Sequence, residues 1–406
     1  MAEPTKRKRV LFISPLSSAL VPFSGYQYRV FHILKHLAVR HEVDLITCGP
    51  RAPHPEPCLL DLTLLRRFKV VPEAVRGPLA GVVAIFRSGP YHAQIFSSNE
   101  MRQAISDWLS QYHYDCVFLC KSDLMGLFLG NQKRGAPAIV IDQIASEPDT
   151  WENLIRNHPK WYYRVYAQLN YHKVLRFIRR AYDRAAAVIC ITERDANITR
   201  QQHPHARVVV VPSGVDPAAY VPRDDPDYTP QTLLFSGTGA ARNVDAMRWY
   251  LESVHAHVKA ECPEIKVLWI GNVERSKIPF VKKCPELKLT GFVEDPVPCF
   301  NKGAIFIAPF RMGEGMKTKI VEAMAMGKVI VSTSMGVQGI DVAGLPFVRV
   351  ADTPEAFAQE LLQFLKNPPK TEKLGACARA YALERYPWDV VLTPLDELLD
   401  DVCSHG

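Results

Sequence analysis

The sequence predicts an α/β protein with two Rossmann-like halves, each built on a mostly parallel sheet. Short apolar runs alternate with helix-length segments from residue 10 onward, four prolines interrupt this alternation near its middle, and a second alternation follows. At 406 residues the chain is too long for one ordinary core and suits two domains. Its composition, 48% hydrophobic and 22% charged, is that of a globular protein.

The first half opens with a strand at residues 10–14 (VLFIS), a helix at 25–40 and a second strand at 43–47 (VDLIT). This order is typical of the start of a doubly wound sheet. Further elements of this half are predicted as a helix around 101–109 and strands at 116–120, 138–142, 188–191 and 208–211. We assign residues 1–216 to this N-terminal domain.

A proline-rich linker is predicted at 217–231, where Pro217, Pro222, Pro226 and Pro230 fall within fourteen residues. The second domain is assigned to 232–385. Its strands are predicted at 232–236, 267–270, 287–289, 305–309 and 329–332. Residues 354–402 are predicted to be helical, with a bend at Tyr386-Pro387-Trp388.

Charge and residue usage restrict the function classes. The net charge of +7 suits an anionic small ligand or an anionic membrane surface and does not require nucleic acid. No apolar run approaches the ~18 residues of a membrane span, and no signal-peptide pattern follows Met1, so we expect a cytoplasmic protein. The ten cysteines are scattered and the histidines form no cluster in sequence, which favours buried free thiols over a metal site.

The most informative stretch is residues 308–328 (APFRMGEGMKTKIVEAMAMGK), which predict a strand, a glycine-flanked turn and a helix. Gly313 and Gly315 permit close backbone approach to a ligand, and the helix N-terminus offers unpaired amides to an anion. The helix terminus contributes only about 0.3–1 kcal/mol at an exposed site. A diphosphate therefore needs added cations, for which Lys317, Lys319 and Arg242 are candidates.

Two carboxylates belong to the same stretch. Glu314 lies in the turn and Glu322 about two helical turns later, so the pair can reach different ends of one elongated ligand. Carboxylates accept hydrogen bonds from sugar or ribose hydroxyls. The spacing alone fits a second interpretation equally well, in which Glu314 caps the helix and Glu322 is an ordinary exposed residue of that helix.

This stretch resembles the Glu-x7-Glu signature of the retaining GT-B glycosyltransferases of family four, and within it the bacterial exopolysaccharide-type sugar transferases. Other segments resemble the same family in the same order, so the resemblance covers most of the chain. These segments are 10–47, 211–216 (VPSGVD), 234–237 (LFSG) and 289–295 (LTGFVED).

The resemblance implies a GT-B architecture: two Rossmann-like domains facing across a cleft, with a C-terminal helix at 386–406 returning to the N-terminal domain. It implies that Glu322 binds the donor ribose and Glu314 the hydroxyls of the transferred sugar. The donor-binding residues would be Gly25, Gly237, Val293, Gly313, Gly315, Met316, Thr318, Lys319 and Glu322. The catalytic residues would be Glu314, Arg242 and Lys317.

The implied activity is transfer of a sugar from a UDP- or GDP-linked donor to a saccharide, lipid-linked or other hydroxyl acceptor, with retention of configuration. No cofactor besides the donor is expected. No metal is expected either, because no Asp-x-Asp pair follows a strand and cations can stabilise the leaving diphosphate. The family's Arg and Lys pair after the second domain's first strand is missing from residues 237–245 (GTGAARNVD), and its double glycine is reduced to Ser24-Gly25.

Three alternatives stay open on these grounds. A catalytically silent nucleotide-sugar scaffold would explain the missing lysine, and an epimerase or a phosphorylase can share the paired fold. A dinucleotide dehydrogenase is disfavoured because no GxGxxG opens either half.

The acceptor is expected at the N-terminal domain, where Lys121, Asp142 and Glu147 follow strand ends. The acids fit capping roles as well. Residues 160–184 combine seven Lys and Arg residues with interleaved aromatics, which fits a peripheral contact with the inner face of a membrane or a solvated helix covering the sheet.

Overall fold

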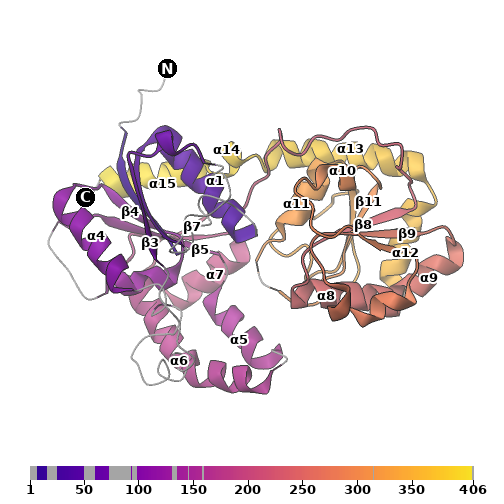
Figure 1. Cartoon of the computed structure of the whole chain (residues 1–406), viewed down its shortest axis with the longest axis horizontal. Helices are drawn as coiled ribbons and strands as arrows, with labels where there is room; N and C mark the ends of the chain where they lie inside the picture. The colour runs from indigo at the N-terminus through magenta and orange to yellow at the C-terminus, as the bar shows by residue number, and fades with distance from the viewer. Residues whose placement is uncertain are drawn as a thin grey trace. The chain divides into compact units, whose positions relative to one another are not determined.

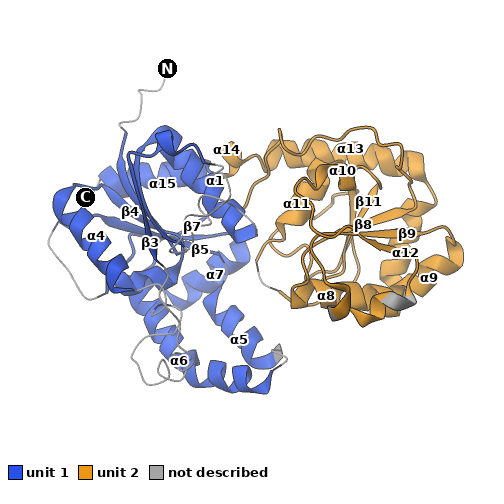
Figure 2. Ribbon diagram, in the orientation of Figure 1, with its two compact units in different colours: residues 1–212, 392–406 blue, residues 213–391 orange. Residues whose placement is uncertain are grey.

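The computed structural model divides the chain into two compact units (Figure 2). Unit 1 comprises Met1–Pro212 with Leu392–Gly406, and unit 2 comprises Ser213–Val391. The residues described are 7–15, 25–49, 60–72, 93, 98–129, 135–144, 146–157, 160–313 and 315–404.

Unit 1 contains a seven-stranded sheet in the order β3-β2-β1-β4-β5-β6-β7, and every neighbouring pair is parallel (Figure 1). The strands are β1 Arg9–Ser14, β2 Glu42–Gly49, β3 Arg67–Pro72, β4 Cys116–Leu119, β5 Ala138–Gln143, β6 Ala187–Cys190 and β7 Val208–Val210. The inner strands are buried on both faces, which explains why they read as unbroken apolar runs rather than as alternating patterns.

Two helices of unit 1, α4 and α7, begin at polar caps. Ser98 accepts a hydrogen bond from the Met101 N–H (3.0 Å), and Thr192 accepts one from the Asp195 N–H (3.0 Å). The helices are α1 Gly25–Arg40, α4 Asn99–Gln111, α5 Glu147–Asn157, α6 Trp161–Arg184, α7 Glu193–Gln202 and α15 Thr393–Ser404, with 3-10 turns η2 Leu62–Leu64 and η3 Ser122–Leu127.

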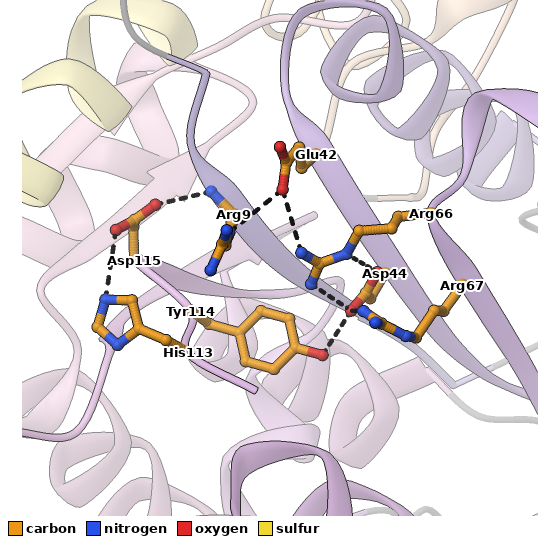
Figure 3. Close-up of polar contacts among 8 residues, drawn as sticks. All are labelled: Arg9, Glu42, Asp44, Arg66, Arg67, His113, Tyr114 and Asp115. Atoms are coloured by element: carbon orange, nitrogen blue, oxygen red, sulfur yellow. Dashed lines mark hydrogen bonds and ion pairs between the residues drawn. The ribbon is translucent and has the colours of Figure 1, made fainter. Parts of the chain in front are cut away.

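A charged network joins the first strands of unit 1 to the loop before β4 (Figure 3). The fully buried Asp44 accepts hydrogen bonds from Arg66 (2.8 and 2.9 Å) and from the Tyr114 hydroxyl (2.6 Å). Burial alone would raise the pKa of Asp44, but these hydrogen bonds outweigh it and hold the pKa below its ordinary value. The network therefore stabilises the folded unit with charges that satisfy one another.

Unit 2 contains a six-stranded parallel sheet in the order β10-β9-β8-β11-β12-β13 (Figure 1). The strands are β8 Thr232–Ser236, β9 Lys266–Ile270, β10 Leu287–Leu289, β11 Ile305–Ala308, β12 Val329–Ser332 and β13 Val348–Val350. The order has its switch point between β8 and β11, where ligands bind at the carboxyl ends of such sheets.

The helical elements of unit 2 include a π-helical turn, η4 Tyr250–Val254. The helices are α8 Ala241–Trp249, α9 His255–Glu261, α10 Val297–Phe300, α11 Thr318–Ala325, α12 Pro354–Leu365, α13 Pro368–Arg385 and α14 Trp388–Val391, with 3-10 turns η5 Arg275–Lys277 and η6 Pro279–Lys283. Gly375 lets α13 approach the end of α11, because a Cβ there would lie 2.2 Å from the Gly327 carbonyl oxygen.

The predicted return of the C-terminus is confirmed. Helix α13 ends at Arg385, α14 begins at Trp388, and α15 belongs to unit 1. In unit 1, Asp396 of α15 accepts a hydrogen bond from His36 (2.8 Å), and Lys8 and Arg207 pair with Asp400 and Asp401.

The predicted alternation of strands and helices is also confirmed in both halves. Among the described residues, no helix combines the length and apolar character that a membrane crossing needs.

Candidate functional site

The candidate site in unit 2 lies where four parallel strands end. Gly237, Gly271 and Gly291 follow β8, β9 and β10, and a glycine-containing turn follows β11. Gly237 donates its N–H to the Ile270 carbonyl (2.8 Å), and Gly271 pairs with Gly291. A Cβ at Gly271 would lie 2.5 Å from the Gly237 carbonyl oxygen, so these backbones meet only without side chains.

Gly237 also makes room for Asn243 on α8. A Cβ at Gly237 would lie 2.6 Å from the Asn243 amide carbon. Asn243 donates to the Thr238 carbonyl (2.9 Å) and accepts a hydrogen bond from the Lys319 ammonium (3.1 Å). The buried Asn243 amide therefore links the loop after β8 to α11, and nothing in the sequence pattern singled it out.

The turn before α11 has the geometry of an anion site. Gly313 (φ +117°) and Gly315 (φ +65°) occupy the left-handed region that favours glycine. Lys317 is the N-cap of α11, and its side chain makes no capping hydrogen bond. In the described part of the chain, the amide groups of the first turn of α11 therefore receive no cap from the N-cap side chain and can bind an anion.

Arg242 and Lys317 flank this turn. A Cβ at Gly313 would lie 3.5 Å from Arg242 Cδ and 3.6 Å from Lys317 Cε, so the side chains of both residues pass beside the same glycine. Lys317 is buried and donates to the Gly315 carbonyl (2.9 Å), whereas Arg242 is exposed. The structure thus brings together two of the predicted catalytic residues.

Lys319 is held against the end of β8. Its ammonium donates to the Ser236 carbonyl (2.7 Å) and lies 5.1 Å from the Phe310 ring centroid. Burial and the nearby Arg242 and Lys317 charges lower the pKa of Lys319 to about 7, although Glu322 opposes the shift. An anion beside Lys319 would relieve the cost of its charge.

Glu322 lies one turn after Lys319 on α11. Burial raises its pKa, while Lys319 and hydrogen bonds from Tyr220 and Thr318 oppose the shift. Tyr220 comes from the stretch predicted as a linker and was not predicted as a site residue. Its contact, together with Thr318, orients a carboxylate near the predicted diphosphate residues.

The remaining predicted donor residues are placed as follows. Val293 is half-buried in the loop after β10, beside Phe292, which is 68% exposed. Met316 is half-buried before α11, and Gly25 is the exposed first residue of α1 in unit 1. Glu314 lies outside the described residues, so its role stays a prediction.

In unit 1, Lys121 and Glu147 lie in one cluster with Asp123. Glu147 accepts hydrogen bonds from Ser122 and Gln143 (both 3.2 Å), and the Lys121 ammonium lies 3.6 Å from Asp123. Burial raises the pKa of both Asp123 and Glu147, and the Asp123 charge raises that of Glu147 further. Two neighbouring carboxyls with raised pKa values are candidates for proton transfer.

Asp142 is engaged within the fold. It is fully buried, and both of its oxygens accept hydrogen bonds from Arg29 (2.7–3.2 Å). Arg29 also donates to the Pro212 carbonyl (3.0 Å). Asp142 therefore anchors α1 to β5, and its contact with an acceptor stays a prediction.

Known proteins resemble the chain in both halves. The model described as "Glycosyltransferase Family 4" matches residues 23–219, and the model "Glycosyl transferases group 1" matches residues 230–367. An "Uncharacterized 44.6 kDa protein in cps region" of Klebsiella pneumoniae is 26% identical over 152 residues, 36% of this chain and 39% of that protein. The phosphatidyl-myo-inositol mannosyltransferase of Mycobacterium tuberculosis is 25% identical over 217 residues, 49% of this chain and 55% of the enzyme. The matches thus span between 39% and 55% of the length of these curated relatives.

Solved structures share the fold over nearly the whole chain. Sucrose-phosphate synthase of Thermosynechococcus elongatus has a TM-score of 0.75 at 13% identity, covering 98% of this chain and 100% of that chain. Anabaena HepE in complex with UDP and glucose has a TM-score of 0.63 at 15% identity, and the match covers 97% of this chain and 99% of that chain. These likenesses and the two parallel sheets confirm the GT-B fold. The two family models, which match both halves of the chain, establish that it belongs to the group 1, family 4 glycosyltransferases.

Proposed function

We propose that the protein transfers a sugar from a nucleotide diphosphate donor to a hydroxyl acceptor, with retention of configuration. One observation carries the proposal. The predicted cations Arg242 and Lys317 flank one glycine turn at the carboxyl edge of the unit 2 sheet, and burial together with these two charges lowers the pKa of the neighbouring Lys319. A diphosphate is the ligand that such a turn and its cations suit best.

The donor would lie with its diphosphate beside Gly313, Gly315 and Lys317, and with its ribose on Glu322. Glu322 suits this role because Tyr220 and Thr318 hold its carboxylate, leaving further lone pairs for ribose hydroxyls. Anabaena HepE was solved with UDP and glucose, which makes a UDP-sugar the first donor to test and a GDP-sugar the second.

The chemical step would depend on stabilising charge on the departing diphosphate. Arg242 and Lys317 are suited to this, because both side chains pass beside Gly313 and the Gly315 carbonyl holds the Lys317 ammonium. Glu314 would hold the hydroxyls of the transferred sugar. In the retaining reaction the acceptor attacks the face that the nucleotide leaves.

The acceptor would bind at unit 1, beside Lys121, Glu147 and Asp142. The raised pKa values of Glu147 and Asp123 support a carboxyl group that accepts the acceptor's hydroxyl proton. The mannosyltransferase relative is named for a lipid acceptor, phosphatidyl-myo-inositol, which makes a lipid-linked acceptor one class to test beside free saccharides.

A membrane-bound acceptor is favoured by one further observation. Trp161, Val165 and Leu169 are 67%, 49% and 60% exposed and recur at i, i+4 and i+8, forming an apolar ridge on α6. Arg164 and Arg176 are exposed on the same helix. Apolar side chains with neighbouring cations fit the surface of an anionic membrane.

Sedimentation with anionic vesicles tests this contact. Trp161→Ser with Leu169→Ser should abolish co-sedimentation, whereas Val390→Ser, at an exposed valine of unit 2, should not. Equal sedimentation of all variants would remove the membrane contact from the proposal and leave donor transfer untouched.

A thermal-shift panel of UDP-, GDP-, ADP- and dTDP-sugars, run with the wild-type chain and Glu322→Ala, tests the donor site. We expect one donor to stabilise the wild type and not the variant. If no donor stabilises a well-folded wild type, the catalytically silent scaffold becomes the better account.

A further inference from the structure

A second cluster of reactive side chains lies in unit 2, away from the glycine-lined edge. His255 begins α9, and Cys284 and Glu286 lie just before β10. The Val267 N–H, at the start of β9, donates to the Glu286 carbonyl (3.1 Å). Because β9 and β10 are parallel, the cluster lies at their amino ends, opposite to the edge that carries Gly271 and Gly291.

One donor atom of each side chain faces the same point. Cys284 Sγ lies 3.5 Å from His255 Nε2 and 3.3 Å from Glu286 Oε2, and these two atoms lie 3.7 Å apart. Zinc bonds of about 2.3 Å to sulfur and about 2.0–2.1 Å to nitrogen or oxygen, at tetrahedral angles, put such atoms about 3.3–3.6 Å apart. The observed separations match those of a tetrahedral zinc site to within about 0.4 Å.

The other polar atoms of His255 and Glu286 have partners of the kind that metal ligands have. His255 Nδ1 lies 3.2 Å from the Tyr250 hydroxyl, and donation from Nδ1 would leave the lone pair on Nε2. Lys259 binds Glu286 Oε1, which leaves Oε2 facing the cluster. His255 and Cys284 are each 7% exposed.

The π-helical turn η4 explains how His255 meets Tyr250. Residues five apart on an α-helix are offset by about 140° around its axis. In η4 the His255 N–H instead donates to the Tyr250 carbonyl, which brings residue 255 above residue 250. Turns of this kind are rare and occur frequently at functional sites. This backbone feature is independent of the ligand distances.

We propose that His255, Cys284 and Glu286 bind one zinc ion, which ties α9 to the segment before β10. Thiolate, imidazole and carboxylate are ligands that zinc accepts, and three of them leave a fourth position for water. Binding forms a Zn–S bond and releases the Cys284 thiol proton to solvent. Because the cluster lies at the opposite sheet edge from the donor turn, the ion takes no direct part in sugar transfer.

Metal titration of the full chain under reducing conditions, after removal of metal with a chelator, tests the proposal. We expect one equivalent of Zn²⁺ per chain after desalting, a zinc-dependent rise in Tm, and thiolate-to-cobalt charge-transfer absorption with Co²⁺. Cys284→Ser and His255→Gln should lose all three. The matched controls Cys377→Ser and His257→Gln, at an exposed cysteine and an exposed histidine of the same unit, should keep them.

Tyr250→Phe keeps every ligand and removes only the hydroxyl beside Nδ1. We expect its zinc affinity to fall about 10- to 100-fold, as for other partners of metal-bound histidines. A wild-type chain without the cobalt–thiolate absorption, or zinc uptake that Cys284→Ser leaves unchanged, would overturn the proposal. The cobalt spectrum of the wild-type chain tests for metal bound through a thiolate even if a variant fails to fold.

Discussion

In unit 1 the carboxylate of Asp44 accepts hydrogen bonds from Arg66 and Tyr114, whereas in unit 2 the ammonium of Lys319 faces two further cations and a single described carboxylate. The first arrangement lowers the pKa of Asp44 against the effect of burial. The second lowers the pKa of Lys319 and leaves that of Glu322 raised. The charges around Asp44 satisfy one another, while those around Lys319 suit an anionic ligand that the described residues do not supply.

The largest expected effect is at Glu322. Glu322→Gln keeps the side-chain shape and removes the charge that would hold two ribose hydroxyls, so we expect nucleotide diphosphates to bind about 100-fold more weakly. Calorimetric titration with UDP and GDP measures the change, with Glu384→Gln, at an exposed position of α13, as the control. Unchanged affinity would remove Glu322 from the donor site.

The corresponding change in unit 1 should affect stability alone. Asp44→Asn leaves Arg66 and Arg67 without their carboxylate, and we expect the free energy of unfolding to fall by about 2 kcal/mol, less than for a fully buried pair because both arginines are partly exposed. Because the pKa of Asp44 is lowered, the wild-type advantage is present above the unfolded pKa and is lost as pH falls through the folded pKa. Urea unfolding at several pH values measures both effects. Weaker nucleotide binding in a folded Asp44→Asn chain would contradict the separation of roles.

The pH dependence of donor binding tests the role of Lys319 in unit 2, as the pH dependence of stability tests that of Asp44 in unit 1. The pKa of Lys319 is about 7 in the folded chain and 10.5 ordinarily, so the folded chain holds fewer protons across this window, and this residue makes stability rise with pH. A bound diphosphate favours the ammonium form. Nucleotide binding should therefore take up a proton, and affinity should weaken by up to about tenfold per pH unit above pH ~7.

Calorimetry in buffers of different ionisation enthalpy measures that proton uptake. Lys319→Arg keeps its charge at every accessible pH and should flatten the profile. A wild-type affinity that does not change between pH ~7 and ~9 would show that Lys319 does not face the anion.

The smallest expected effect concerns the glycines after β8. Gly237→Ala forces a Cβ against Asn243, which holds Lys319, and we expect a loss of about 1–2 kcal/mol with weaker nucleotide binding. Gly239→Ala meets nothing closer than 3.8 Å and should change stability by less than about 0.5 kcal/mol. Thermal unfolding of both variants gives the comparison. If both variants lose the same stability, the contact with Asn243 does not explain why residue 237 is glycine.

The fold was predictable because the inner strands are short apolar runs separated by helix-length segments. The edge strands β3 and β13 were not predicted from the sequence. The middle of β3 is exposed, so its residues carry no apolar run. The three-residue edge strands β7 and β10 were predicted, so neither edge position nor shortness explains why β13 was missed.

The site was predictable mainly where its residues are close in sequence, although Arg242 was predicted from 75 residues before Lys317. Lys317, Lys319 and Glu322 share one helix start, but Tyr220 and Asn243 reach α11 from segments about 75 to 100 residues away. The zinc cluster was missed for the same reason. His255 and Cys284 are 29 residues apart and belong to no recognised spacing, so only the fold brings them together.

The most direct test of the central claim is calorimetric titration of the wild-type chain with UDP and GDP beside uridine and guanosine. If the cations around Gly313 and Lys319 form a diphosphate site, one diphosphate should bind at least about tenfold more tightly than its nucleoside. Equal binding of nucleoside and diphosphate, or binding of neither by a folded chain, would contradict the account.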